Sequence, residues 1–529
     1  MNKIYLIYLC PILIYFFLLN HFPYGLVDDA YIPMTYARNL VEGHGIVFYP
    51  GGERVEGFTS PLWMFVLSIF AFVKLSLPAA AFYGGILFGA GTIILTSLIY
   101  RRVFQDQNQS ALLPSLWAAL AGILLVADAS FPAWSSSGMD TAIYSFCLLL
   151  MIYALADEWQ PRLIFLFLLM LSLIRPEGPA YAIPVSVYYT LHKKYPCQRV
   201  VKSLLLYFIL PFGLFLLCRY LYFGTFLPNT FYAKHDFRGW ILLQRGVFYI
   251  LTFFQPRPLY FIALLWLALE KPDLRNICLL LWLFLLTQIG VVILEGGDHF
   301  ALHRFLVPVL PLLAIGTTRG FQRLMELYLL SQFNHLNTHK KIIIHVASVF
   351  PVLIILCAHS VQLFEYKAND RYHFSNGAYW HFDEVNWARG WARIGNWLQE
   401  KYPPTTRIAV ITAGAIPFYS RLPAIDLVGL NTRAIARSEF PAASTQYTGH
   451  EKANAEYVLQ QEPQFIQLFP MLMFSSTPYP EEKLEEMVQY PAQKELWHHP
   501  QFFEKYRYTT EETPYGIISY FELRNQKNE

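Results

Sequence analysis

Residues 277–294 read ICLLLWLFLLTQIGVVIL, a run of apolar residues that contains no charged side chain. A helix of about 20 such residues is long enough to cross the hydrocarbon core of a bilayer. Of the 529 residues in the chain, 55% are hydrophobic and only 15% are charged, whereas a soluble protein has about 25% charged residues. The composition therefore predicts a polytopic membrane protein and excludes a largely disordered chain.

Further apolar runs predict about eleven membrane crossings. The run at 4–19 is interpreted as an uncleaved anchor, because no small-residue cleavage site follows it. Basic residues stay in the cytoplasm when loops are short. With Arg101-Arg102 and Lys340-Lys341 inside, the N-terminus is inside and the C-terminus is outside. The predicted spans are 4–19, 80–100, 112–128, 140–156, 162–175, 178–191, 203–223, 258–270, 277–294, 304–318 and 342–361.

Two other parts of the chain are expected on the outer side of the membrane. Within the first outer loop, 24–79, the segment Pro61–Phe72 is apolar but short, and a crossing there would move Arg101-Arg102 outside. We therefore expect a helix that lies on the outer surface. After residue 361 the chain becomes polar and aromatic. Strands are expected at 407–412, 424–428, 464–469 and 516–523, and a helix at 387–401.

The predicted fold is thus a polytopic α-helical transmembrane domain at 1–361 and a periplasmic α/β domain at 362–529. The six cysteines have no spacing typical of a disulfide framework or a zinc site, so an outer domain must fold without covalent staples. The net charge is +3, from 40 Lys+Arg and 37 Asp+Glu. This balance argues against a nucleic-acid partner.

Polar residues gather in the outer loops, at the edges of apolar helices. Charges at such positions are unfavourable unless they pair or face water, so a functional cleft is expected there. Nearby glycines would let the backbone approach a ligand. The candidate substrate-cleft residues are Arg54, Glu56, Asp140, Glu177, Asn229, Asp298, His299 and His303.

Asp28 and Asp29 directly follow the first apolar run. Neighbouring side chains on a helix point about 100° apart, so one carboxylate can face a cavity while the other caps the helix expected at Ala30–Leu40. A carboxylate can take a proton from an attacking hydroxyl that it reaches. The alternative is that both aspartates only cap that helix, since Asp is favoured at such positions.

The same loops contain cationic side chains that could bind an anion such as a phosphate. Simpler roles are a pair between Arg175 and Glu177, and a helix-end charge at Arg304. Asp298, His299 and His303 could also bind a metal, so a divalent cation is a possible cofactor. The candidate phosphate ligands are Arg175, Lys234, His235 and Arg304.

Five stretches of the sequence, in order, carry a likeness to a known family. They are VDDAYIPMTYARNLVEGHGIVFYPGGERVEGFTSPLW at Val27–Trp63, then SGMDT, RPEG, LPNTFYAK and GGDHFALHRFLVP. This pattern resembles the bacterial family that includes mycobacterial terminal arabinofuranosyltransferases, which are membrane glycosyltransferases of the C type (GT-C). The likeness covers about residues 25–320. Met139-Asp140 stands where relatives often have Leu-Glu.

The resemblance implies a GT-C fold in the bacterial inner membrane and an inverting sugar transfer on the periplasmic face. The donor would be a polyprenyl-phosphate-linked sugar and the acceptor a cell-envelope glycan or lipid. An aspartate of the first outer loop, by position Asp28 or Asp29, would be the general base. A cation near the donor phosphate could stabilise the leaving group, so that no protonating acid is required.

Two other classes of protein compete with this interpretation. A secondary transporter would also bury ionisable residues, but transporters usually show two related halves and a site near the midplane. The chain shows no such repeat, and its polar clusters lie in loops on one side. A non-enzymatic envelope assembly scaffold is the other alternative, and it has no need of Asp28 and Asp29 beside outward-facing cations.

Overall fold

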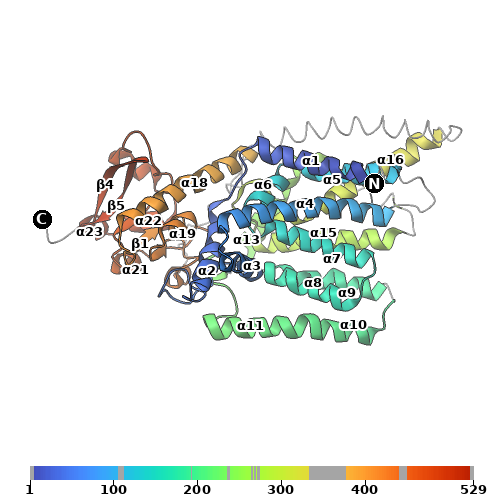
Figure 1. Cartoon of the computed structure of the whole chain (residues 1–529), viewed down its shortest axis with the longest axis horizontal. Coiled ribbons are helices and arrows are strands. Elements are labelled where there is room, and N and C mark those ends of the chain that lie inside the picture. The colour runs from blue at the N-terminus through green and yellow to red at the C-terminus, as the bar shows by residue number, and fades with distance from the viewer. Residues whose placement is uncertain are drawn as a thin grey trace.

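The structure is a computed structural model. It describes residues 5–104, 112–191, 194–234, 239–263, 266, 270, 274–332, 377–439 and 449–524. Long helices run side by side along the longest axis, and a small sheet-containing unit lies at one end of them (Figure 1). The N-terminal helix and the helices that follow it form a bundle, and the C-terminal unit covers the end of the bundle at which the loop helices α2 and α3 lie.

The described part of the bundle is built from α-helices, four short 3-10 helices (η1, η2, η4 and η6) and one π-helical segment (η3). They are α1 (Tyr5–His21), η1 (Asp28–Ala30), α2 (Tyr31–Val41), α3 (Pro61–Phe72), α4 (Leu77–Phe104), α5 (Leu112–Ala127), α6 (Ser130–Ser136), α7 (Thr141–Ala156), α8 (Pro161–Ile174), η2 (Gly178–Tyr181), α9 (Ala182–Leu191), α10 (Cys197–Leu204), η3 (Leu205–Ile209), α11 (Leu210–Phe223), α12 (Asn229–Lys234), α13 (Gly239–Phe254), η4 (Pro258–Tyr260), α15 (Arg275–Glu295), η6 (Ala301–Val309) and α16 (Leu310–Gln332). Proline at the first position starts α3 and α8, where its missing N–H is not needed. Left-handed glycines end α11 and α15, at Gly224 and Gly296.

Four described helical stretches are long and apolar enough to cross a membrane: Leu77–Phe104, Cys197–Phe223, Asn276–Glu295 and Ala301–Leu327. A fifth results if α5 and α6, which meet at 71°, form one broken span. Five more apolar helices are shorter, among them α3, α7 and α8. The eleven predicted crossings are therefore not established by helix length. The predicted span 342–361 lies outside the described residues, and 258–270 lies only partly within them.

One apolar helix, α13, is absent from the predicted spans. Its sequence contains Gln244 and Arg245, which interrupt the apolar run. In the structure Arg245 is buried, and its Nη1 lies 2.9 Å from Oε1 of Glu451 in the C-terminal part of the chain. A charge that finds a partner far along the chain can be buried in a helix, and the local sequence does not show that partner.

The C-terminal part forms a five-stranded sheet with the strand order β2-β1-β3-β5-β4. β1 pairs in parallel with β2 and β3, and β5 pairs antiparallel with β3 and β4. Its elements are α18 (Gly377–Lys401), β1 (Ile408–Val410), α19 (Ala415–Ser420), β2 (Ala424–Asp426), α20 (Arg433–Ala436), α21 (Ala455–Gln460), β3 (Phe465–Gln467), η7 (Glu481–Lys483), η8 (Glu485–Met487), α22 (Pro491–Trp497), α23 (Phe502–Lys505), β4 (Tyr506–Thr513) and β5 (Gly516–Leu523).

The four strands expected in this region are confirmed as β1, β2, β3 and β5. β4 was not predicted, because it is an edge strand in which polar residues occupy both faces. The helix expected at 387–401 begins earlier, at Gly377. The strands of this sheet that are buried have continuous apolar runs, which is the pattern that sequence reasoning detects best.

Hydrogen bonds and an ion pair attach this C-terminal unit to the bundle. The side-chain amide of Asn229 donates to the carbonyl oxygens of Gly429 (2.9 Å) and Leu430 (3.0 Å). The Arg245–Glu451 ion pair joins α13 to the same unit. In addition, α18 packs on η1, α6 and η6. The two parts of the chain therefore meet at the polar end of the bundle.

Within the bundle, a buried ion pair holds the broken α5–α6 segment against α13 and η4. The guanidinium of Arg257 binds the carboxylate of Asp128 through two hydrogen bonds, of 2.8 and 3.2 Å. It also donates to the hydroxyl of Ser130 (2.7 Å) and to the carbonyl of Phe253 (2.9 Å). Both charged side chains are almost fully buried, so each needs the other to compensate its charge.

Replacement of Asp128 by Ala should leave Arg257 buried without its counter-charge. Loss of one partner of a buried pair typically costs about 3–5 kcal/mol, so the apparent melting temperature in detergent should fall by several degrees. The control is Asp157→Ala, which removes an exposed pair with Arg102 and should have little effect. Equal melting temperatures for the two variants would contradict this account.

Candidate active site

The two adjacent aspartates have different surroundings. The Asp28 carboxylate accepts hydrogen bonds from the backbone N–H groups of Gly414 (3.0 Å) and Ala415 (2.7 Å), at the start of α19. Burial raises the pKa of Asp28 to about 7, although these two donors oppose the shift. Asp28 therefore caps a helix, but this helix is α19 of the C-terminal unit and not the helix that follows Asp28 in the sequence.

Asp29 is half-buried, and its carboxylate has no hydrogen bond or ion pair with any described residue. Burial raises the pKa of Asp29, while the positive charges of Lys234 and Arg304 oppose that shift. The carboxylate thus lies close enough to both cations for their charges to lower its pKa. Of the two aspartates, Asp29 is the one whose oxygen atoms remain available to a ligand.

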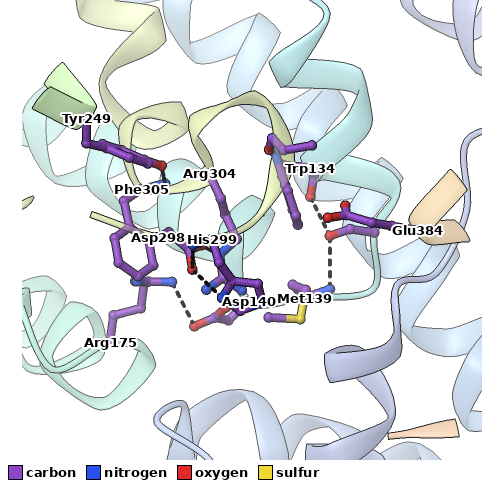
Figure 2. A network of polar contacts seen from close by, with 12 residues as sticks. Trp134, Met139, Asp140, Arg175, Tyr249, Asp298, His299, Arg304, Phe305 and Glu384 are labelled. Atoms are coloured by element: carbon purple, nitrogen blue, oxygen red, sulfur yellow. Dashed lines mark hydrogen bonds and ion pairs between the residues drawn. The ribbon is translucent and has the colours of Figure 1, made fainter. Parts of the chain in front are cut away.

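Arg304 lies in a paired and aromatic setting at the start of η6. Its Nε is 2.7 Å from Oδ2 of Asp298, and its guanidinium lies over the rings of Phe300, at 4.6 Å, and Phe305, at 5.1 Å. Its Nη1 is buried without a hydrogen-bond partner among the described residues. Figure 2 shows Arg304, Asp298 and His299 close together. One donor group of Arg304 is therefore left over for a further anion.

Asp298 is surrounded by positive groups. Its carboxylate also accepts from the backbone N–H of His299 at 3.0 Å. Burial alone would raise the pKa of Asp298, but Arg304, His299 and Lys234 outweigh it and lower that pKa. The ion pair indicates that Asp298 holds Arg304 in place.

Lys234 ends the short helix α12. Its ammonium group has no ion pair within the described part of the chain, although it lies near enough to Asp29 and Asp298 to affect their pKa values. Its side chain passes beside Gly449 of the C-terminal unit. His235, also expected to bind phosphate, lies outside the described residues.

Arg175, expected to bind phosphate, is already paired. It forms ion pairs with Glu177 and, at 3.6 Å, with Oδ2 of Asp140. Its guanidinium lies over the rings of Phe305 (4.7 Å) and Tyr144 (5.7 Å). Because two carboxylates already compensate its charge, Arg175 matches the simpler role considered for it in the sequence.

Three residues predicted in the cleft have contacts that join parts of the structure. The carboxylate of Glu56 binds Arg219 at 2.8 and 3.0 Å, and burial raises the pKa of Glu56 to about 7 against the effect of that arginine. Asn229 binds the backbone at 429 and 430. Arg54 is exposed and stacks on Tyr222 at 4.8 Å.

The metal site left open for Asp298, His299 and His303 does not form among the described residues, where no group of three His, Cys, Asp or Glu side chains is placed to hold an ion. His303 hydrogen bonds to Thr252 at 3.0 Å. Leu302 and His303 have positive φ values of 60° and 53°, so the four-residue spacing does not put the two histidines on one helical face.

Sequence reasoning missed several residues near the site. Arg219 is a charge inside an apolar span, which is by itself a signal of a functional or buried partner. Glu384 of α18 approaches Ala301 of η6, and Figure 2 places it close to Trp134. The ring of His450 contacts that of His299, with centroids 5.1 Å apart. The two C-terminal residues had no signal in the sequence, since only tertiary contact brings them here.

Comparison with known proteins gives two kinds of match. Residues 379–522 match a family model described as a domain of unknown function, DUF8728. No curated protein sequence matches the chain.

Solved structures resemble nearly the whole chain. ArnT from Cupriavidus metallidurans in the apo state is 14% identical, with a TM-score of 0.54 over 98% of this chain and 97% of that one. The oligosaccharyltransferase from Archaeoglobus fulgidus in the apo form is 12% identical, with a TM-score of 0.50 over 100% of this chain and 75% of that one. The same ArnT bound to undecaprenyl phosphate aligns at a TM-score of 0.48, with 15% identity over 80% of this chain and 85% of that one.

These matches define the class of fold. The chain is a helical protein with apolar helices and the GT-C fold of membrane glycosyltransferases, as the sequence resemblance implied. Identities this low establish a shared fold and not a shared sugar or acceptor. A specific relation to arabinofuranosyltransferases does not follow from them.

Substitution of Asp28 by Ala should loosen the contact between η1 and α19. Loss of a side chain that caps a helix typically costs about 1 kcal/mol, so the amide hydrogens of Gly414 and Ala415 should exchange faster with deuterium. The control is Glu42→Ala, which removes an exposed ion pair to Arg421 at the other end of α19. Unchanged exchange at residues 414 and 415 in Asp28→Ala would refute the capping role.

Proposed function

We propose that this protein is an inverting glycosyltransferase that moves a sugar from a polyprenyl-phosphate donor to a cell-envelope glycan or lipid. The observation that carries the proposal is the free carboxylate of Asp29 beside Lys234 and Arg304, at the end of an apolar bundle with the GT-C fold. Asp29 acts as the general base in this proposal, and Asp28 has a structural role.

Burial raises the pKa of Asp29 above its ordinary value, which makes this carboxylate a stronger base than an exposed one. The oxygen of the acceptor hydroxyl attacks the anomeric carbon while the bond from that carbon to the phosphate oxygen breaks. Asp29 takes the hydroxyl proton. The sugar ends with inverted configuration, and a polyprenyl phosphate leaves.

The two cations would stabilise the leaving group. The phosphate gains negative charge as the bond breaks, and preorganised positive groups at that point lower the barrier. Lys234 offers an ammonium without an ion pair to the described residues, and Arg304 offers a buried Nη1 without a hydrogen bond to them. Arg175 is not required, because Glu177 and Asp140 already neutralise it.

A lipid-linked donor suits the placement of this site. Four described helical stretches are long and apolar enough to cross a membrane, and such a donor would reach the site by diffusing in that membrane. In this proposal the bundle, 1–361, spans the bacterial inner membrane, and the unit at 362–529 lies on the periplasmic side. Arabinofuranose is the first donor sugar to test, because the five sequence motifs resemble enzymes that transfer it.

Asp29→Asn should abolish sugar transfer while the protein still inserts and folds. The variant keeps the size of the side chain and removes its ability to accept a proton. The assay is transfer from a radiolabelled polyprenyl-phosphoryl sugar by the purified enzyme in detergent, with loss of at least about 100-fold expected for removal of a general base.

Asp28→Asn is the matched control. It should retain most of its activity, since an amide oxygen can still accept a hydrogen bond from Gly414 or Ala415. Wild-type activity in Asp29→Asn would end the general-base assignment. Loss in Asp28→Asn alone would move that assignment to Asp28.

The pH profile of transfer should report the raised pKa of Asp29. A general base works only when it is deprotonated, so kcat/KM should fall as pH decreases through that pKa, which lies above the ordinary value of about 3.9 for Asp. The measurement is kcat/KM between pH 4 and 9 with a constant donor. A rate that stays constant down to about pH 4 would show that no carboxylate with a raised pKa controls the reaction.

A further inference from the structure

Two motifs singled out in the sequence, SGMDT and RPEG, have no part in the proposed base or phosphate site, yet they meet in the structure. The first starts α7 and the second follows α8. Arg175 joins them, since it pairs with Glu177 of its own motif and with Asp140 of the other, at 3.6 Å. The two segments therefore form one polar cluster.

This cluster adjoins the reaction site. The backbone N–H of Val27 donates to the carbonyl of Ser137 at 3.2 Å, immediately before the two aspartates. Gly138 has a φ of 77°, and a Cβ added to it would lie 3.2 Å from the Cβ of Ala30, which follows Asp29. Figure 2 shows Arg175 and Asp140 facing the Asp298–Arg304 pair. The SGMDT backbone thus packs directly against the segment that carries Asp29.

Several polar atoms of the cluster are buried without a hydrogen bond. Oγ1 of Thr141 and Oε2 of Glu177 have no hydrogen-bond partner among the described residues, and Oδ2 of Asp140 has only the ion pair with Arg175, at 3.6 Å. The three residues are only 4%, 1% and 5% exposed. A buried acceptor without a donor is destabilising, and an unsatisfied group in a native structure calls for a specific explanation. Two such groups, and a third oxygen that meets its counter-charge only at 3.6 Å, lie next to the proposed reaction site and indicate that a ligand supplies further partners.

The chemistry of the cluster selects the kind of ligand. Two carboxylates surround one guanidinium, so the cluster repels a phosphate. The guanidinium plane of Arg175 lies over the rings of Phe305 and Tyr144, which cover it. What remains is a set of acceptor oxygens and one hydroxyl, which match groups that can donate and accept hydrogen bonds. Sugar hydroxyls are such groups.

We propose that Asp140, Thr141 and Glu177 form a subsite that binds hydroxyl groups of the donor sugar and thereby sets which sugar is transferred. This inference rests on the proposed function. In it Arg175 is a positioning residue, which holds Asp140 and Glu177 through its two ion pairs. The phosphate lies toward Lys234 and Arg304, and the sugar ring lies between those cations and this subsite.

The test pairs protein variants with donors that lack one hydroxyl. Asp140→Asn, Glu177→Gln and Thr141→Val are each nearly the same size as the natural residue. Thr141→Val leaves the ion pairs intact, so at least one variant should fold. The donors are farnesyl-phosphoryl arabinofuranose and its 2-deoxy and 3-deoxy forms, and kcat/KM is measured for every combination. Ser172→Ala is the control, because its hydroxyl bonds only to the carbonyl of Leu168 in its own helix.

With the complete donor, Asp140→Asn and Glu177→Gln should lose about 10- to 100-fold in kcat/KM, the range for one hydrogen bond to a charged group, and Thr141→Val about 2- to 10-fold, the range for a neutral one. With the deoxy donor that lacks the matching hydroxyl, the variant and the wild type should have the same kcat/KM, because the hydrogen bond is already absent. If the residue had a purely structural role, its variant would have a lower kcat/KM than wild type by the same factor with every donor. That result would overturn the subsite. Wild-type enzyme that transfers none of these donors would overturn arabinofuranose as the donor sugar of the proposed function, a result distinct from failure of the subsite.

Discussion

Charged side chains at the end of an apolar helix bundle are stable only when each has a partner or faces water. This constraint explains most of the polar geometry in the protein. Arg304 pairs with Asp298, Arg175 pairs with Glu177, and Arg219 holds another carboxylate in the first loop. Against this background the exceptions are informative. Asp29 and Lys234 have no ion pair within the described chain, and the charge of Lys234 lowers the pKa of Asp29 against the effect of burial.

The C-terminal unit has a part in this arrangement. It provides the two backbone donors that bind Asp28, which leaves Asp29 as the available carboxylate. It also brings Glu384 and His450 to the edge of the site. Since α18 packs on η1, α6 and η6, the unit contacts the elements that carry Asp29 and Arg304. The region that matches a domain of unknown function therefore contacts the candidate active site.

Much of the fold could be predicted because its signals are local. Long apolar runs give α4 and α15, and buried strands such as β1 and β3 give short continuous apolar stretches. The failures also have physical causes. α13 contains Arg245, whose charge is compensated by Glu451 more than two hundred residues later. The edge strand β4 has polar residues on both faces, so it lacks the alternation that marks a half-buried strand.

The sequence by itself determined the class of protein, the cluster of acidic and basic residues at the helix edges, and the pair of aspartates that includes the candidate base. It could do so because hydrophobicity and the tolerance of a membrane for charge depend on residue type alone. Only the tertiary structure separated Asp28 from Asp29, showed the partners of Glu56, Asn229 and His303, and joined SGMDT to RPEG. Those distinctions depend on which donor or counter-charge lies within a few ångströms, and the nearest partner of each group comes from a distant part of the chain.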